Sequence, residues 1–128
     1  MKSRAKSQKS EKPFVTTAAH KKNVTAHTKM VTAAAKQLRA QGIAAKEKRR
    51  LEFFFATNTQ RKAQALVDVL HLHGCNVVLV GSGKKFMVTG ITPARAMSLP
   101  SLREWANDMV TLGFEFDSLF DGWNVSLV

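Results

Sequence analysis

The sequence lacks the features that would place it in a membrane or an oxidising compartment. No run of 18 or more apolar residues occurs, so we expect no membrane-spanning helix. No apolar stretch follows the first basic residues, so we expect no secretory signal. Cys75 is the single cysteine and cannot form an internal disulfide. Together these absences predict a cytoplasmic protein in a reducing environment.

Acidic residues are scarce in the first part of the chain. Residues 1–50 carry 14 Lys and Arg against two acids, a balance of +12, whereas residues 51–128 carry 6 Lys and Arg against seven acids. The formal net charge of +11 therefore resides entirely in the N-terminal part. Such an asymmetry predicts either an arm that meets RNA or another acidic surface, or a tail that only solubilises the chain.

The basic part divides into a tail and a helix. Residues 1–22 offer little apolar surface, and we expect a disordered tail there. The Ala-rich stretch 23–41, followed by Gly42, predicts a helix within the basic segment 23–50. Because alanine buries little area, we expect this helix to lean on the domain rather than form part of its core. The predicted nucleic-acid-binding residues are cations of this region: Lys21, Lys22, Lys29, Lys36, Arg39, Lys46, Lys48, Arg49 and Arg50.

Residues 51–128 predict one α+β domain. Hydrophobic periodicity and turn residues indicate strands at 51–57, 76–80, 85–91 and 119–127, the last with a possible bulge at Gly122, and helices at 58–73 and from 98 onward. This β-α-β-β-α-β order is that of ferredoxin-like folds, in which two helices cover one face of a four-stranded antiparallel sheet. Since all these elements follow Arg49, we expect a fragment that begins there to fold alone.

No group of side chains supports catalysis or a bound metal or cofactor. The loop 81–84 (Gly-Ser-Gly-Lys) lacks the spacing of a phosphate-binding loop, and it predicts a hairpin turn instead. His71, His73 and Cys75 lie two residues apart and cannot converge from one helix. No Ser/His/Asp or Cys/His arrangement can be assembled from the sequence. We therefore expect a binding protein that is not an enzyme and has no metal or cofactor.

Two aromatic residues offer a second way to bind RNA. The predicted topology is shared with RNA-recognition domains, which stack bases on aromatic side chains of the middle strands. Phe54 and Phe86 are the candidates here, although the strand 85–91 lacks the glycines and the second aromatic residue of the usual signature. A base-stacking platform on the sheet is thus an alternative to the basic arm.

The C-terminal stretch Leu99–Trp123 (LPSLREWANDMVTLGFEFDSLFDGW) resembles the RraB family, which inhibits ribonuclease E. The resemblance rests on the helix with Trp105 and Met109 and on the sequence 120–123 (Phe-Asp-Gly-Trp), and it extends more loosely back to Leu51. It implies a ferredoxin-like domain that binds a ribonuclease and catalyses nothing. Two departures are Asn124, where the family pattern usually has glycine, and the basic arm.

The motif residues have two interpretations. In the structural one, Asp121 hydrogen-bonds a bulged backbone that Gly122 permits, and Trp123 fills the gap between sheet and helix. In the other, the motif is a partner-binding surface. The residues concerned are Phe120, Asp121, Gly122, Trp123 and Trp105.

The sequence therefore predicts a non-catalytic, RraB-like regulator. Its partner would be a ribonuclease or another protein, with the basic arm helping to hold RNA or an acidic surface. Two alternatives are a nucleic-acid-binding protein that acts through its arm and an immunity- or antitoxin-type protein. The oligomeric state is left open.

Overall fold

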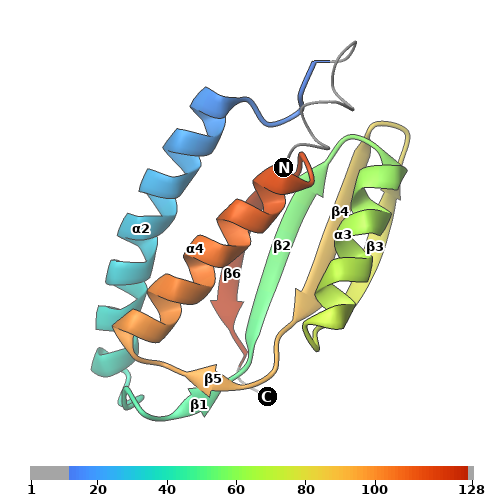
Figure 1. The fold of residues 1–128 in the computed structure, drawn as a ribbon. Coiled ribbons are helices and arrows are strands. Elements are labelled where there is room, and N and C mark those ends of the chain that lie inside the picture. The colour runs from blue at the N-terminus through green and yellow to red at the C-terminus, as the bar shows by residue number, and fades with distance from the viewer. Residues whose placement is uncertain (1–11, 127–128) are drawn as a thin grey trace.

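The computed structural model describes residues 12–126, which form three helices beside a four-stranded antiparallel sheet (Figure 1). The helices are α2 (Thr17–Ala40), α3 (Gln60–Leu72) and α4 (Leu99–Glu115). The strands of the main sheet are β2 (Leu51–Thr57), β3 (Asn76–Ser82), β4 (Lys85–Ile91) and β6 (Leu119–Val125). A second, two-stranded sheet, which the sequence did not predict, pairs β1 (Lys48–Arg49) with β5 (Arg95–Ala96).

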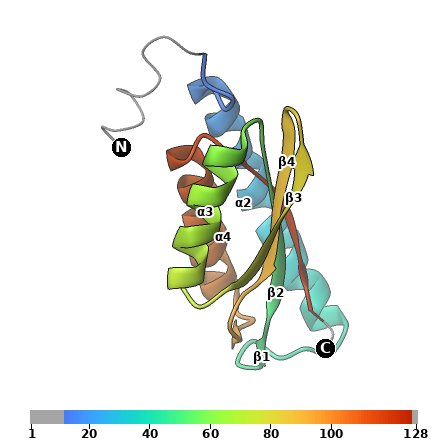
Figure 2. The same ribbon diagram turned by 90° about the vertical axis from the view of Figure 1, so that its right-hand side faces the viewer.

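The main sheet has the order β3-β4-β2-β6, so β2 lies between two partners. Every second side chain of β2 points to one face, and Leu51, Phe53 and Phe55 are each 0% exposed there. Helices α3 and α4 cover this face, whereas no described helix lies over the other side of β3 and β4 (Figure 2). Most of the core thus lies between the sheet and these two helices.

Local capping fixes where the helices begin. The hydroxyls of Thr59 and Ser98 accept backbone N–H groups at the first turns of α3 and α4, which satisfies donors that have no partner within the helix. Gly81, near the end of β3, and Gly83, in the turn before β4, both adopt positive φ values. The predicted hairpin is therefore present, but its turn is Gly83–Lys84, because Gly81 and Ser82 belong to β3 and pair with Phe86 and Lys85 of β4.

Helix α2 begins six residues earlier than predicted. Residues 17–22 were expected in the disordered tail, but they form the first turns of the helix, with Thr16 as its N-cap. The His20 ring stacks on Phe114 of α4 with 4.0 Å between ring centroids. Such tertiary contacts are invisible in the local composition that suggested disorder. Residues 1–11 of the predicted tail lie outside the described part of the chain.

Helix α2 also contributes to the core, contrary to the expectation that it only leans on the domain. Val31, Ala35 and Leu38 belong to the same buried cluster as the residues of the sheet. His27 is buried on this face as well, at 4% exposure. A stripe of one histidine, one alanine and two larger apolar residues gives a weak sequence signal, which explains the underestimate.

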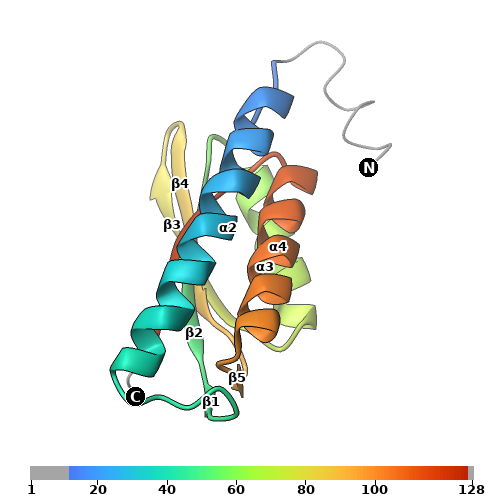
Figure 3. The same ribbon diagram turned by 90° about the vertical axis from the view of Figure 1, so that its left-hand side faces the viewer.

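The same helix closes one edge of the sheet. Strand β6 is a terminal strand, and the carbonyl of Phe120 accepts hydrogen bonds from Asn23 Nδ2 at 3.2 Å and His27 Nε2 at 3.0 Å. Figure 3 shows α2 running in front of the sheet on the side of β6. Within residues 12–126, α2 is the longest helix, and none of the helices is both long and apolar enough to cross a membrane.

A bulge interrupts the pairing of β2 with β6. Phe54 lies opposite Gly122, but Phe55 lies opposite Phe120, so Asp121 has no pairing partner in β2. The predicted bulge is therefore present, with Asp121 rather than Gly122 as its extra residue. The consequence is that Asp121 is exposed while Phe120 points into the core.

Candidate functional site

Most of the sequence motif lies in an aromatic cluster between the sheet and α4. The Trp105 ring makes edge contacts with Phe120 at 5.8 Å and with Trp123 at 5.5 Å between centroids. Phe120 also packs on Phe55 at 5.2 Å. Trp105 and Phe120 are buried, so these two side chains belong to the core. In this geometry, Trp123 lies between the sheet and α4, whereas Asp121 of the same motif is exposed.

Trp123 additionally borders an apolar groove. This groove, of about 450 Å³, lies between the C-terminal half of α2 and β6 and includes Met30, Leu38 and Ile43. Met30 is 46% exposed. Trp123 Nε1 is buried without a hydrogen-bond partner in the structure, so the indole has an unused donor.

Four of the predicted nucleic-acid-binding residues form a basic ridge on α2: Lys21, Lys22, Lys29 and Lys36. Three of them are spaced seven residues apart and therefore align along the helix, about 10.5 Å between successive residues at 1.5 Å per residue. Helical geometry places this row opposite the buried stripe from His27 to Leu38. Helix α2 contains no acidic residue, so no carboxylate within the helix neutralises the ridge.

The remaining predicted cations divide into two kinds. Arg39 donates to the carbonyls of Ile43 and Met97, so its guanidinium ties the end of α2 to the segment before α4. Arg49 forms an ion pair with Glu47 at 2.6 Å. Both therefore have structural partners that the sequence analysis did not foresee. Three others are exposed around β1, beyond the C-terminal end of α2: Lys46, Lys48 and Arg50.

The aromatic platform predicted on the sheet is absent because its two residues lie on opposite faces. Phe54 is on the face away from α3 and α4, directly opposite Thr89 of β4. Phe86 is only 7% exposed and belongs to the core on the helix-covered face. Phe86 and Thr89 are three residues apart on β4, so their side chains point to opposite faces of the sheet, and Phe54 shares the face of Thr89. Phe54 and Phe86 therefore cannot stack consecutive bases. The base-stacking alternative is therefore wrong.

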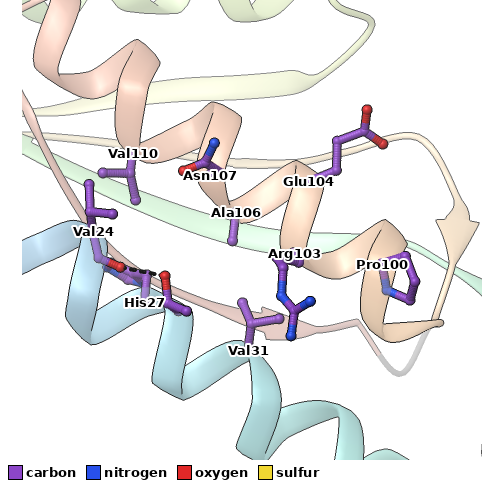
Figure 4. Close-up of a pocket in the computed structure, with 10 residues that line it drawn as sticks. Val24, His27, Val31, Pro100, Arg103, Glu104, Ala106, Asn107 and Val110 are labelled. Atoms are coloured by element: carbon purple, nitrogen blue, oxygen red, sulfur yellow. Dashed lines mark hydrogen bonds between the residues drawn. The ribbon is translucent and has the colours of Figure 1, made fainter.

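A second groove, of about 430 Å³, follows the seam between α2 and α4 (Figure 4). His27 and Val31 line it from α2, and Arg103 reaches across from α4 toward Val31. Burial lowers the pKa of His27 below its usual value, more strongly than the Phe120 carbonyl and the charge of Asp121 raise it. Within residues 12–126, no three His, Cys, Asp or Glu side chains are grouped so as to hold a metal ion.

We expect His27 to make stability depend on pH. Because the folded pKa is below that of the unfolded chain, lowering the pH through the unfolded value protonates the unfolded state first. Stability should therefore fall as the pH drops below about 6.5, by at most about 1.4 kcal/mol per pH unit for this one proton. Urea unfolding at several pH values, with the variant His27→Gln, measures the slope.

The variant should show a shallower dependence between pH 7 and 5 than the unchanged protein. His71→Gln is the matched control, because His71 is exposed near the end of α3. An identical pH slope in the His27 variant and in the unchanged protein would show that His27 is not the titrating group.

A buried ionic cluster, the Asp117 clasp, was not predicted from the sequence. It is formed by Asp117, Lys62 and the backbone of Phe14 and Val15. The Asp117 carboxylate accepts from the N–H groups of Phe14 at 2.9 Å and Val15 at 2.8 Å, and it pairs with Lys62 Nζ at 2.6 Å. Its side chain is only 3% exposed. More than 100 residues separate Asp117 from the segment that it holds, so no local pattern announces the contact.

A comparison with models of known protein families shows the family of this chain. The model of a family described as RraB, regulator of ribonuclease activity B, matches residues 29–125. The chain belongs to the RraB family. The match confirms the resemblance seen in Leu99–Trp123 and extends it back into α2. Among curated proteins, no match was found.

The RraB match begins at Lys29, near the middle of α2. The C-terminal half of the helix, with the core residues Val31, Ala35 and Leu38, lies inside the match. The start of the helix, with Asn23 and His27 at the edge of β6, precedes it, as do the two residues held by the Asp117 clasp. Members of this family are described as regulators of ribonuclease activity.

Proposed function

We propose that this RraB protein is a non-catalytic regulator that binds a ribonuclease and contacts RNA through the basic ridge of α2. Family membership supports the ribonuclease as partner. The observation that supports the RNA contact is the row of Lys22, Lys29 and Lys36 on the face of α2 opposite its buried stripe. A row of lysines without interleaved acids can follow phosphates without reading bases.

The fold supports this assignment. The strand order β3-β4-β2-β6, with α3 and α4 on one face, supports a ferredoxin-like domain that carries α2 as an addition. Helix α2 is fixed to this domain by buried side chains and by hydrogen bonds to Phe120. A fixed helix presents its cations in one orientation, so RNA binding there loses less conformational entropy than binding to a flexible tail.

The protein partner would bind elsewhere on the surface. In this proposal the groove beside Trp123 is the candidate site, because its lining is mostly apolar and includes the exposed side chain of Met30. Aromatic side chains with a polar atom are frequent at the centre of protein interfaces. The buried motif residues Trp105 and Phe120 would then support this surface from below rather than touch the partner.

The test removes the ridge and measures how RNA affinity depends on salt. If about six cations of the full chain contact single-stranded RNA, log K against log salt should slope by roughly −4. The triple variant Lys22→Gln/Lys29→Gln/Lys36→Gln removes three contacts and should bring the slope to about −2, at about 0.7 per contact. Fluorescence anisotropy with a labelled single-stranded RNA at several salt concentrations gives both slopes.

The control removes the same charge from another place. Arg61→Gln/Lys84→Gln/Lys85→Gln changes three exposed cations away from α2 and should leave the slope near that of the unchanged protein. Both variants should still bind the ribonuclease, because neither alters the groove beside Trp123. Equal slopes for the two triple variants would refute the ridge as the RNA site.

A further inference from the structure

The two edge strands of the main sheet differ in whether their outward backbone groups are bonded. At β6, side chains of α2 bond to the outward carbonyl of Phe120. At β3, no described element pairs with the outer edge, so backbone N–H and C=O groups face away from β4 unpaired. Soluble proteins usually block such an edge with charges, proline or a covering element, because a free edge recruits another strand.

Strand β3 has none of the usual protections. Asn76–Ser82 contains no charged residue and no proline, although the whole chain has a net charge of +11. Val78 and Val80 are 59% and 52% exposed on the face that the helices leave open. A seven-residue, neutral and valine-rich edge strand of this kind is suited to strand addition.

We propose that β3 pairs with β3 of a second copy of this chain, in an antiparallel arrangement that joins two four-stranded sheets into one of eight strands. A register centred on Leu79 matches all seven residues of the strand with those of the second copy. In it, Val78 lies opposite Val80 of the second copy, and the reverse pair repeats by the two-fold axis. Valines directly opposite each other stabilise such a pairing.

The placement of charge limits repulsion between two copies paired at β3, and it favours the antiparallel direction. The basic segment 1–50 carries the excess charge, and α2 within it lies at the β6 edge, farthest from β3 in the strand order. Lys84 and Lys85 follow the C-terminal end of β3, so antiparallel pairing separates the two lysine pairs by about the length of the strand, roughly 24 Å at 3.4 Å per residue. Parallel pairing would place all four together.

The assembly would also be closed. Two-fold pairing uses both β3 edges, and the remaining edges at β6 are covered by α2. Growth therefore stops at the dimer. The two basic ridges would then lie at opposite ends of the eight-stranded sheet, whose terminal strands are about 34 Å apart at 4.8 Å per strand.

Analytical ultracentrifugation of the full chain over a range of concentrations tests the association. The unchanged protein should form a dimer and nothing larger. The variant Val78→Lys/Val80→Lys places like charges directly opposite each other and should weaken the dimer by about tenfold or more. Met87→Lys is the control, because Met87 is exposed on the same face but belongs to the inner strand β4.

Disulfide formation tests the register. In the proposed pairing, Leu79 faces Leu79 of the second copy at about 5 Å between Cα atoms, so Leu79→Cys should crosslink. Val78→Cys is more exposed but would lie about 7–8 Å from its equivalent, too far for a disulfide, and should not.

Three results would overturn the proposal. A monomer at every concentration would leave the edge to a strand from a different protein. Equal weakening by Met87→Lys would indicate a general apolar contact, and stronger crosslinking of Val78→Cys would exclude the register.

Discussion

A fragment that begins at Arg49 is expected to lose most of its stability. The structure puts Val31, Leu38 and Ile43 into the core, and all three are absent from this fragment. Each large apolar side chain contributes about 1.5–3 kcal/mol when buried, so the loss is on the order of 5 kcal/mol. Small domains are stable by only about 5–15 kcal/mol, so this loss is of the same size as the total.

Further losses act in the same direction. Without α2, the carbonyl of Phe120 loses its bonds from Asn23 and His27, and the edge of β6 becomes free. The fragment also lacks the backbone N–H groups of Phe14 and Val15 that bind Asp117. We therefore expect weak cooperativity, bound hydrophobic dye and a tendency to associate.

Thermal melting followed by circular dichroism measures this expectation, with chemical denaturation for the free energy. The control is a chain that begins at Lys12, which keeps every contact described above and should unfold like the full chain within about 0.5 kcal/mol. A cooperative transition of the Arg49 fragment close to that of the full chain would support the independent domain expected from the sequence and contradict the larger role of α2.

Elements whose signals are local in the sequence were predicted well, whereas features that depend on contacts between distant residues were not. The strand 51–57 and the helix from Ser98 were predicted within a residue, because alternation, capping and a first-turn proline are local. The stripe of α2 was underestimated since His27 is buried through a hydrogen bond to Phe120, 93 residues away. Phe86 was considered for RNA binding because a strand pattern alone does not say which face the helices cover.

The residues of the candidate site were likewise predicted only as far as local sequence allows. The cations of α2 were identified by composition, and helical geometry then aligned Lys22, Lys29 and Lys36. Composition could not reveal that Arg39 and Arg49 bond within the chain, because their partners are carbonyl groups and a neighbouring acid. A list of basic residues therefore overstates a polyanion site wherever arginines also anchor the backbone.

Replacing Asp117 is expected to destabilise the protein by about 3 kcal/mol or more. Its carboxylate is nearly buried, receives two backbone N–H groups and pairs with Lys62, whose side chain is 10% exposed. Removing one partner of a buried pair leaves the other charge without compensation, which typically costs 3–5 kcal/mol. The hydroxyl of Thr57 also donates to the Asp117 carbonyl, so the clasp joins the chain segment before α2 to β2 and α3.

Asp117→Asn is the sharper variant because it separates charge from backbone conformation. Asp117 has φ of 51°, a left-handed conformation that asparagine tolerates and alanine does not. The matched control, Asp121→Asn, makes the same change at an exposed site four residues away and should shift stability by less than about 0.5 kcal/mol. Chemical denaturation gives both values, and hydrogen exchange reports on the amides of Phe14 and Val15.

The two measurements together locate the effect. If the clasp holds the segment before α2, these two amides should exchange faster in Asp117→Asn even under conditions where the core stays protected. Faster exchange there with an intact core would mean that the segment detaches locally while α2 stays on α4. Unchanged exchange and stability in Asp117→Asn would contradict the clasp, because the amide side chain would then replace the carboxylate at no cost despite losing the charge that faces Lys62.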